Sequence, residues 1–92
     1  MKESLIEKKV CEHAKSLGWL VFKFKTANHR GVPDRIFMRD GIVLFIEFKA
    51  KNGKLSKLQE ITIRNFQVNK IPTYIVASVE QGKAIFDRIE NA

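Results

Sequence analysis

The sequence predicts an α/β domain in which a central mixed β-sheet is flanked by helices, with the elements in the order αβββαβα. Three observations indicate this fold. The chain begins with apolar residues at helical spacing. Two strand-like runs then meet at Asp40-Gly41, a dipeptide typical of a tight hairpin. The run over residues 42–46 is apolar at every position, which suits a central strand covered on both faces.

The first helix is expected over residues 4–17, where apolar side chains alternate with lysines and glutamates at helical spacing. Gly18 should end this helix, because glycine is favoured just past a helix C-terminus. A strand is expected over residues 19–25, half-buried and with a basic side. Leu20, Phe22 and Phe24 lie on one face, which is expected to be the buried one, and Val21, Lys23 and Lys25 lie on the other, basic face.

The remaining elements follow from turn residues and apolar runs. A polar loop over residues 26–31 precedes two strands, over 32–39 and 42–50, on either side of Asp40-Gly41. Asn52-Gly53 marks a turn. A second helix should begin at Ser56 and reach about residue 70, followed by a short strand over 72–78 and a last helix over 79–89.

Length and charge limit the classes of function. The 92 residues, 45% of them hydrophobic, suit one globular domain that spans residues 1–92. Seventeen Lys and Arg residues against ten Asp and Glu residues give a net charge of +7, which favours a polyanionic partner. Nucleic acid is the first candidate. The alternative is a solvated basic surface that binds nothing charged.

Cys11 is the only cysteine, so the chain can form neither an internal disulfide nor a cysteine-based zinc site. The first nine residues are rich in charge, and nowhere do about 18 apolar residues follow one another. We therefore expect a cytoplasmic protein without a membrane span. Cys11, His13 and Trp19 lie in or beside apolar stripes and are expected to be structural.

The hairpin predicts where charged residues meet. If Asp40 and Gly41 are its two loop residues, paired residues have numbers that sum to 81, and Asp34 lies opposite Glu47. Lys49, two residues further on, shares their face. Two carboxylates about 5 Å apart repel by roughly 3 kcal/mol at an effective dielectric near 20. A positive charge must therefore lie close to both.

Two candidates can supply that charge. A divalent cation such as Mg²⁺ binds one or two carboxylates together with waters and phosphate oxygens. Lys49 alone could instead neutralise the pair, which would make the three residues an ordinary ion-pair cluster at the sheet margin. Convergent ionisable groups beside apolar walls are enriched at functional sites, and this favours the metal site.

Two segments carry a resemblance to a known family. Gly31-Val32-Pro33-Asp34 and Ile46-Glu47-Phe48-Lys49 resemble the PD-(D/E)XK nuclease pattern, and their form is most similar to the VRR-NUC (virus-type replication-repair nuclease) family. Glu7 in the first helix, Gly18-Trp19 and Gln59 extend the resemblance over nearly the whole chain. It implies a restriction-endonuclease-like fold.

The resemblance also implies roles for individual residues. Asp34, Glu47 and the backbone carbonyl of Phe48 would bind Mg²⁺ or Mn²⁺, and Lys49 would orient or activate the attacking water and stabilise developing charge.

Glu7 and Gln59 would complete the catalytic set. Each also lies three residues after a serine, Ser4 or Ser56, so a capping box explains either residue equally well. An active-site role is favoured for Glu7, because it borders the inward face of its helix, and both roles stay open for Gln59.

Basic residues before the motif are candidates for contacts with DNA phosphates. These candidates are Lys23, Lys25, Asn28, His29 and Arg30. The alternative is a solvated strand edge whose charges only prevent unwanted strand pairing.

Similar stand-alone domains occur in phages and act on branched DNA, so the resemblance implies a structure-specific DNA endonuclease, with a Holliday junction resolvase as the particular candidate. We expect a homodimer, with Ile63 and Phe66 among its interface residues, because so small a domain has a thin core. One rival is a non-catalytic basic DNA-binding module. A structural protein with incidental charge is the other.

Overall fold

The computed structural model describes all residues, 1–92, and has the predicted element order αβββαβα. The elements are α1 (Glu3–Ser16), β1 (Leu20–Lys23), β2 (Arg35–Arg39), β3 (Ile42–Phe48), α2 (Lys57–Val68), β4 (Thr73–Val76) and α3 (Val79–Glu90). The helices match their expected ranges to within about two residues. The strands are shorter than expected, so that both Asp34 and Lys49 lie one residue outside a strand.

The four strands form one mixed sheet in the order β1-β2-β3-β4. β1, β2 and β3 are successively antiparallel, whereas β4 runs parallel to β3. β3 is therefore an inner strand, as the apolar run over residues 42–46 predicts. The hairpin prediction is also confirmed: Asp40 and Gly41 have φ angles of 50° and 80°, and the pairs Arg39↔Ile42 to Arg35↔Ile46 all sum to 81.

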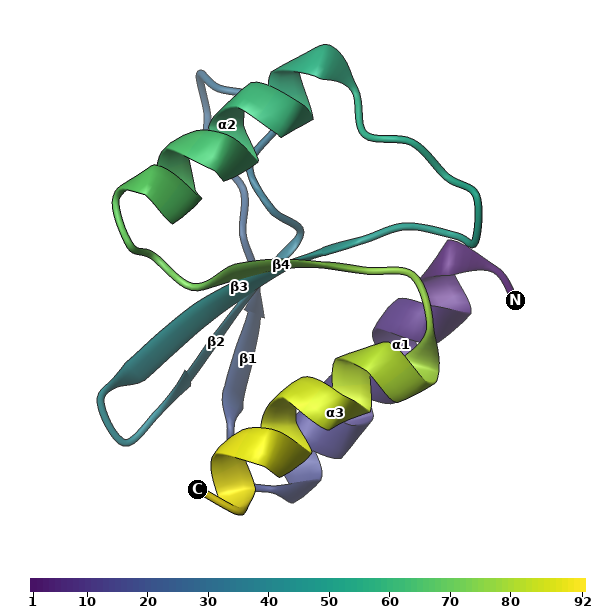
Figure 1. Ribbon diagram of the computed structural model, residues 1–92, viewed down its shortest axis with the longest axis vertical. Coiled ribbons are helices and arrows are strands. Elements are labelled where there is room, and N and C mark those ends of the chain that lie inside the picture. Colours follow the sequence, from purple (N-terminus) through teal and green to yellow (C-terminus); the bar gives the residue numbers. More distant parts are fainter.

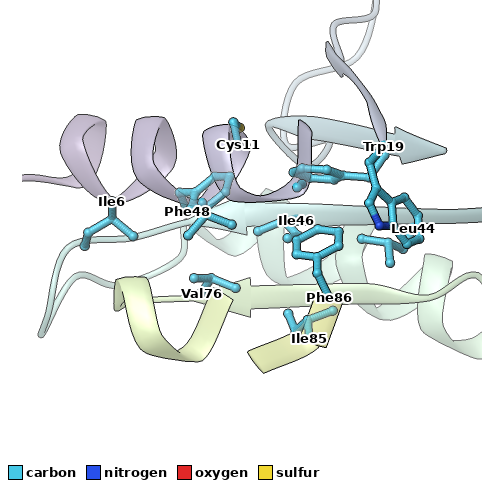
Figure 2. Packing of buried hydrophobic residues seen from close by; sticks show 12 residues of the cluster. Ile6, Cys11, Trp19, Leu44, Ile46, Phe48, Val76, Ile85 and Phe86 are labelled. Atoms are coloured by element: carbon cyan, nitrogen blue, oxygen red, sulfur yellow. The ribbon is translucent and has the colours of Figure 1, made fainter. Parts of the chain in front are cut away.

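Helices cover both faces of the sheet. α1 and α3 lie side by side on one face, and α2 lies on the other (Figure 1). The main core lies between the sheet and the α1/α3 pair (Figure 2). Its twelve buried members are Ile6, Val10, Cys11, Ala14, Trp19, Phe37, Leu44, Ile46, Phe48, Val76, Ile85 and Phe86. The structural roles expected for Cys11 and Trp19 are thus confirmed, and His13 joins α1 to α3 through an Asp87 contact of 2.7 Å.

The expectation for the buried side of β1 is wrong. Leu20 and Phe22 are 58% and 52% exposed, whereas Val21 packs against the main core. The reason lies in the unequal cover of the two faces. α1 packs against β1 on the Val21 face, but α2 does not cover Leu20 and Phe22 at this edge of the sheet. Only Phe24, beyond the strand, reaches an aromatic cluster with Phe45 and Phe66.

α2 packs its apolar stripe onto the sheet, which corrects a second expectation. Ile63 is only 2% exposed, so it is a packing residue and is not available for a subunit interface. Phe66 is half-buried against the rings of Phe24 and Phe45.

Among the helices, none has both the length and the apolar character that a membrane crossing requires.

Candidate active site at the open end of the hairpin

Asp34 lies one step beyond the last hydrogen-bonded pair of the hairpin, opposite Glu47. The backbone N–H of Phe48 donates to Asp34 Oδ2 at 2.8 Å. The N–H of Phe24 donates to the Asp34 carbonyl at 2.9 Å. Asp34 is therefore held from both sides, by β3 through its carboxylate and by the end of β1 through its backbone.

Glu47 is buried at the centre of the site, with an exposed fraction of only 1%. Its Oε2 accepts a hydrogen bond of 3.0 Å from Gln59 Nε2 and lies 3.5 Å from Lys49 Nζ. Its Oε1 is also buried and has no hydrogen-bond partner. A buried carboxylate oxygen without a partner is unfavourable. Glu47 Oε1 therefore still lacks the positive group that would satisfy it.

Burial and nearby negative charges raise the pKa of both carboxylates. Desolvation raises the pKa of Glu47 to about 7, with the charge of Asp34 as the next cause and Lys49 acting in the opposite direction. Desolvation likewise raises the pKa of Asp34, against the Phe48 N–H bond that lowers it. The Glu7 and Glu3 charges add to the rise. Lys49 alone thus does not offset the cost of burying this acid pair.

The donor set fits a hard divalent cation. Such ions prefer carboxylate, carbonyl and water oxygens, and Mg²⁺ commonly takes only one or two carboxylates from a protein. The chain has no group of three or more His, Cys, Asp or Glu side chains placed to bind a metal. A cation here would therefore rely on Asp34, Glu47 and non-side-chain oxygens. The unpartnered Glu47 Oε1 is the feature that favours a cation over an ion-pair cluster.

Glu7 does not belong to a capping box. The N-cap of α1 is Lys2, without a side-chain hydrogen bond, and Ser4 lies inside the helix. Glu7 Oε2 instead accepts a bond of 2.6 Å from Arg35 Nε, on the strand residue next to Asp34. Arg35 was not among the residues that the sequence pattern singled out. Its signal was an arginine on the same face of β2 as the buried Phe37, where a charged side chain requires a partner.

Gln59 forms the capping box and also contacts Glu47. Its backbone N–H donates to Ser56 Oγ at 3.1 Å, and its Oε1 accepts from the Ser56 N–H at 2.9 Å, which completes a capping box. Its Nε2 is then free to donate to Glu47. One side chain thus joins the start of α2 to the buried carboxylate.

An open cleft of about 340 Å³ adjoins the acid pair and gathers most of the basic candidates. Glu7 and Asp34 line it together with Lys23, Lys25, His29 and Arg30. Asn28 is exposed in the same loop but does not line the cleft. Glu47 and Lys49 are also absent from its walls, so Asp34 connects the cleft to the buried carboxylate.

The loop between β1 and β2 rests on α2. His29 Nε2 lies 2.9 Å from Thr62 Oγ1, a contact that the sequence analysis did not foresee. A Cβ on Gly31 would come within 2.9 to 3.0 Å of Leu58, so the loop backbone approaches α2 closely there. α2 therefore positions both Gln59 and the basic loop.

This fold and site define an α/β domain of the PD-(D/E)XK type, with Pro33-Asp34 before β2 and Glu47-Phe48-Lys49 at the end of β3. The chain belongs to the VRR-NUC domain family, whose model matches residues 2–80.

Two relatives support this assignment. The chain is 33% identical over 60 residues to a protein described as "Putative nuclease p44" from Acyrthosiphon pisum secondary endosymbiont phage 1. The aligned region covers 64% of each chain, and so less than two thirds of the relative. A solved structure described as a VRR_NUC domain superposes with a TM-score of 0.86 at 26% identity, over 95% of this chain and 96% of that one.

Proposed function

We propose that this protein is a divalent-cation-dependent endonuclease that hydrolyses phosphodiester bonds in DNA. The observation that carries the proposal is the buried Glu47, whose Oε1 has no partner although Asp34 and Lys49 lie beside it. A salt-bridge cluster that served only stability would satisfy both carboxylate oxygens. Membership of the VRR-NUC family and the net charge of +7 point in the same direction.

In this proposal Asp34, Glu47 and the backbone carbonyl of Phe48 would hold Mg²⁺ or Mn²⁺. The cation would neutralise the carboxylates and polarise the phosphodiester that is cut. Lys49 lies 3.5 Å from Glu47, so its ammonium can orient the attacking water and stabilise charge that develops on the phosphoryl oxygens. Glu7 would act from the cleft wall, with its carboxylate held by Arg35.

The basic side of the cleft is the proposed DNA-binding surface. Lys23, Lys25 and Arg30 line the same cleft as Asp34, so a phosphate backbone bound to them would lie beside the acid pair. Asn28 is exposed in the same loop and would contact DNA outside the cleft. His29 is proposed to hold the loop through Thr62 as well as to face the DNA.

The finer part of the proposal concerns the substrate. One centre of this kind cuts one strand, whereas resolving a four-way junction requires paired nicks in two strands, which a two-fold dimer supplies directly. We propose a homodimer that acts on branched DNA as a Holliday junction resolvase. The small size of the domain and its thin core support association with a second copy.

A cleavage panel tests the proposal. The purified protein is incubated with single-stranded, duplex, flap and four-way DNA, each with Mg²⁺, with Mn²⁺ and with a chelator. We expect cation-dependent cutting, and cutting at paired, symmetric positions in the four-way substrate. Salt-dependent DNA binding without cutting under any condition would contradict the enzyme and favour the non-catalytic binding module. Binding that ignores salt would contradict any nucleic-acid role.

A further inference from the structure

Glu47 is bonded from one side only, and this sets which of its oxygens is left open. Gln59 and Lys49 both approach Oε2, at 3.0 Å and 3.5 Å, whereas Oε1 has no partner. A partial turn of the carboxylate would break the Gln59 hydrogen bond, and a half-turn only exchanges its two equivalent oxygens. Gln59 therefore fixes the direction in which Oε1 presents its lone pairs.

The orientation of the Gln59 amide is in turn fixed by Ser56. The Ser56 N–H is a donor, so only the amide oxygen of Gln59 can face it at 2.9 Å, and the amide nitrogen must point the other way, toward Glu47. Ser56 Oγ holds the backbone of the same residue through the Gln59 N–H, at 3.1 Å. Two hydrogen bonds to one serine thus set both the position and the direction of the Gln59 side chain.

We propose that Ser56 is a positioning residue, which acts through Gln59 to hold the Glu47 carboxylate in the orientation that leaves Oε1 free for a cation. The inference rests on the proposed function and adds a residue to it. Ser56 itself is exposed and does not line the cleft, so it does not touch the substrate bound there. Without the Ser56 side chain, the Gln59 N–H loses its acceptor and the first turn of α2 loosens. The remaining bond from the Ser56 N–H then no longer holds the Gln59 amide against Glu47.

The chain contains a matched control on α3. Ser78 is the N-cap of that helix and accepts a bond of 3.1 Å from the Gln81 N–H, the same spacing and the same residue types as Ser56 and Gln59. The Gln81 amide contacts only backbone, at Ala77 N and Ile75 O. Ser56→Ala and Ser78→Ala therefore remove equivalent caps, but only the first is connected to a carboxylate.

The test compares Ser56→Ala, Ser56→Thr and Ser78→Ala in the full chain. We expect the two alanine variants to lose similar thermal stability, because each removes one N-cap. Only Ser56→Ala should shift the side-chain NMR signals of the Gln59 amide and the Glu47 carboxyl, and only it should weaken Mn²⁺ binding. Its kcat should fall about tenfold or more, with KM for DNA changed less than about twofold, because the carboxylate is misplaced and the DNA surface is intact.

Threonine retains the capping hydroxyl, so Ser56→Thr should restore the signals, the Mn²⁺ affinity and kcat. Unchanged Gln59 and Glu47 signals in Ser56→Ala, or equal losses of kcat in the two alanine variants, would overturn the role of Ser56. If the unaltered protein cuts no DNA, the proposed function fails, whereas the NMR comparison still decides whether Ser56 positions Glu47.

Discussion

Glu47 shows how a single residue opposes stability at this site. Its carboxylate is buried beside Asp34, and desolvation raises its pKa to about 7. At neutral pH and above, the folded protein must therefore hold a charge that it stabilises less well than water does. Strain of this kind is common where a group is retained for its chemistry.

The first prediction concerns the stability of the metal-free protein. The pKa of Glu47 rises from 4.5 to about 7 on folding, so the folded state binds more protons between these values. The stability that Glu47 contributes in its protonated form is complete below pH 4.5 and is lost as the pH rises through 7. Glu47→Gln should therefore increase the free energy of unfolding at pH 8, by up to about 3 kcal/mol, and raise the melting temperature accordingly. At pH 5 both changes should be smaller.

Thermal melts in chelator at the two pH values measure this difference. Glutamine has the same shape and keeps an oxygen for the Gln59 donor, so the comparison isolates the charge. Mn²⁺ should raise the melting temperature of the unaltered protein at pH 8 but not that of the variant. A variant that melts lower at pH 8 would show that Glu47 and Lys49 form a stabilising ion pair instead.

At the scale of elements, the loop between β1 and β2 depends on its contact with α2. Gly31 has a φ of 88°, and a Cβ there would meet Leu58 at 2.9 Å. Gly41 in the hairpin has a similar φ of 80° but open space around it. The two glycines share a left-handed backbone and differ in crowding.

The second prediction uses this pair. Gly41→Ala should cost about 1 kcal/mol, the usual strain of a left-handed alanine, whereas Gly31→Ala should cost about 2 kcal/mol or more because the loop must also move off α2. Chemical denaturation of both variants measures the difference. DNA binding should weaken only in Gly31→Ala, since this loop carries Arg30. Equal costs for the two substitutions would contradict close docking of the loop.

The third prediction concerns the basic side of the cleft. Lys23 and Lys25 line it, so replacing both with alanine should make the slope of log affinity against log salt less steep. The change should correspond to the loss of about two phosphate contacts. Lys83→Ala with Arg88→Ala on α3 removes the same charge away from the cleft and serves as the control. An identical slope in the Lys23/Lys25 variant and the unaltered protein would reject the DNA-binding surface.

Elements with local signals were predictable from the sequence. Asp40-Gly41 determined the hairpin register, and the register placed Asp34 opposite Glu47. The buried face of β1 was not predictable, because it depends on which helix covers that edge of the sheet. The ion pair between Glu7 and Arg35 was not predictable for a related reason. The two residues are 28 apart in the sequence, and only the packing of α1 on the sheet brings them together.

At the scale of the whole molecule, the fourth prediction is a homodimer with two Asp34, Glu47 and Lys49 centres. Its interface must use residues other than Ile63, which is buried within one chain. Light scattering at micromolar concentration should give about twice the chain mass of 10.6 kDa. The monomer mass, together with paired cuts in a four-way junction, would contradict the dimeric resolvase and leave a nuclease that works as single subunits.

We propose that the buried carboxylate pair of Asp34 and Glu47 holds a cation for DNA hydrolysis. The most direct measurement is cleavage of the preferred DNA with Mn²⁺ by the unaltered protein, Asp34→Asn and Glu47→Gln, with DNA affinity measured on the same samples. We expect both variants to lose cutting by at least about a hundredfold while DNA affinity stays within about threefold, because the basic cleft is unchanged. Cutting at the unaltered rate by either variant would contradict this proposal.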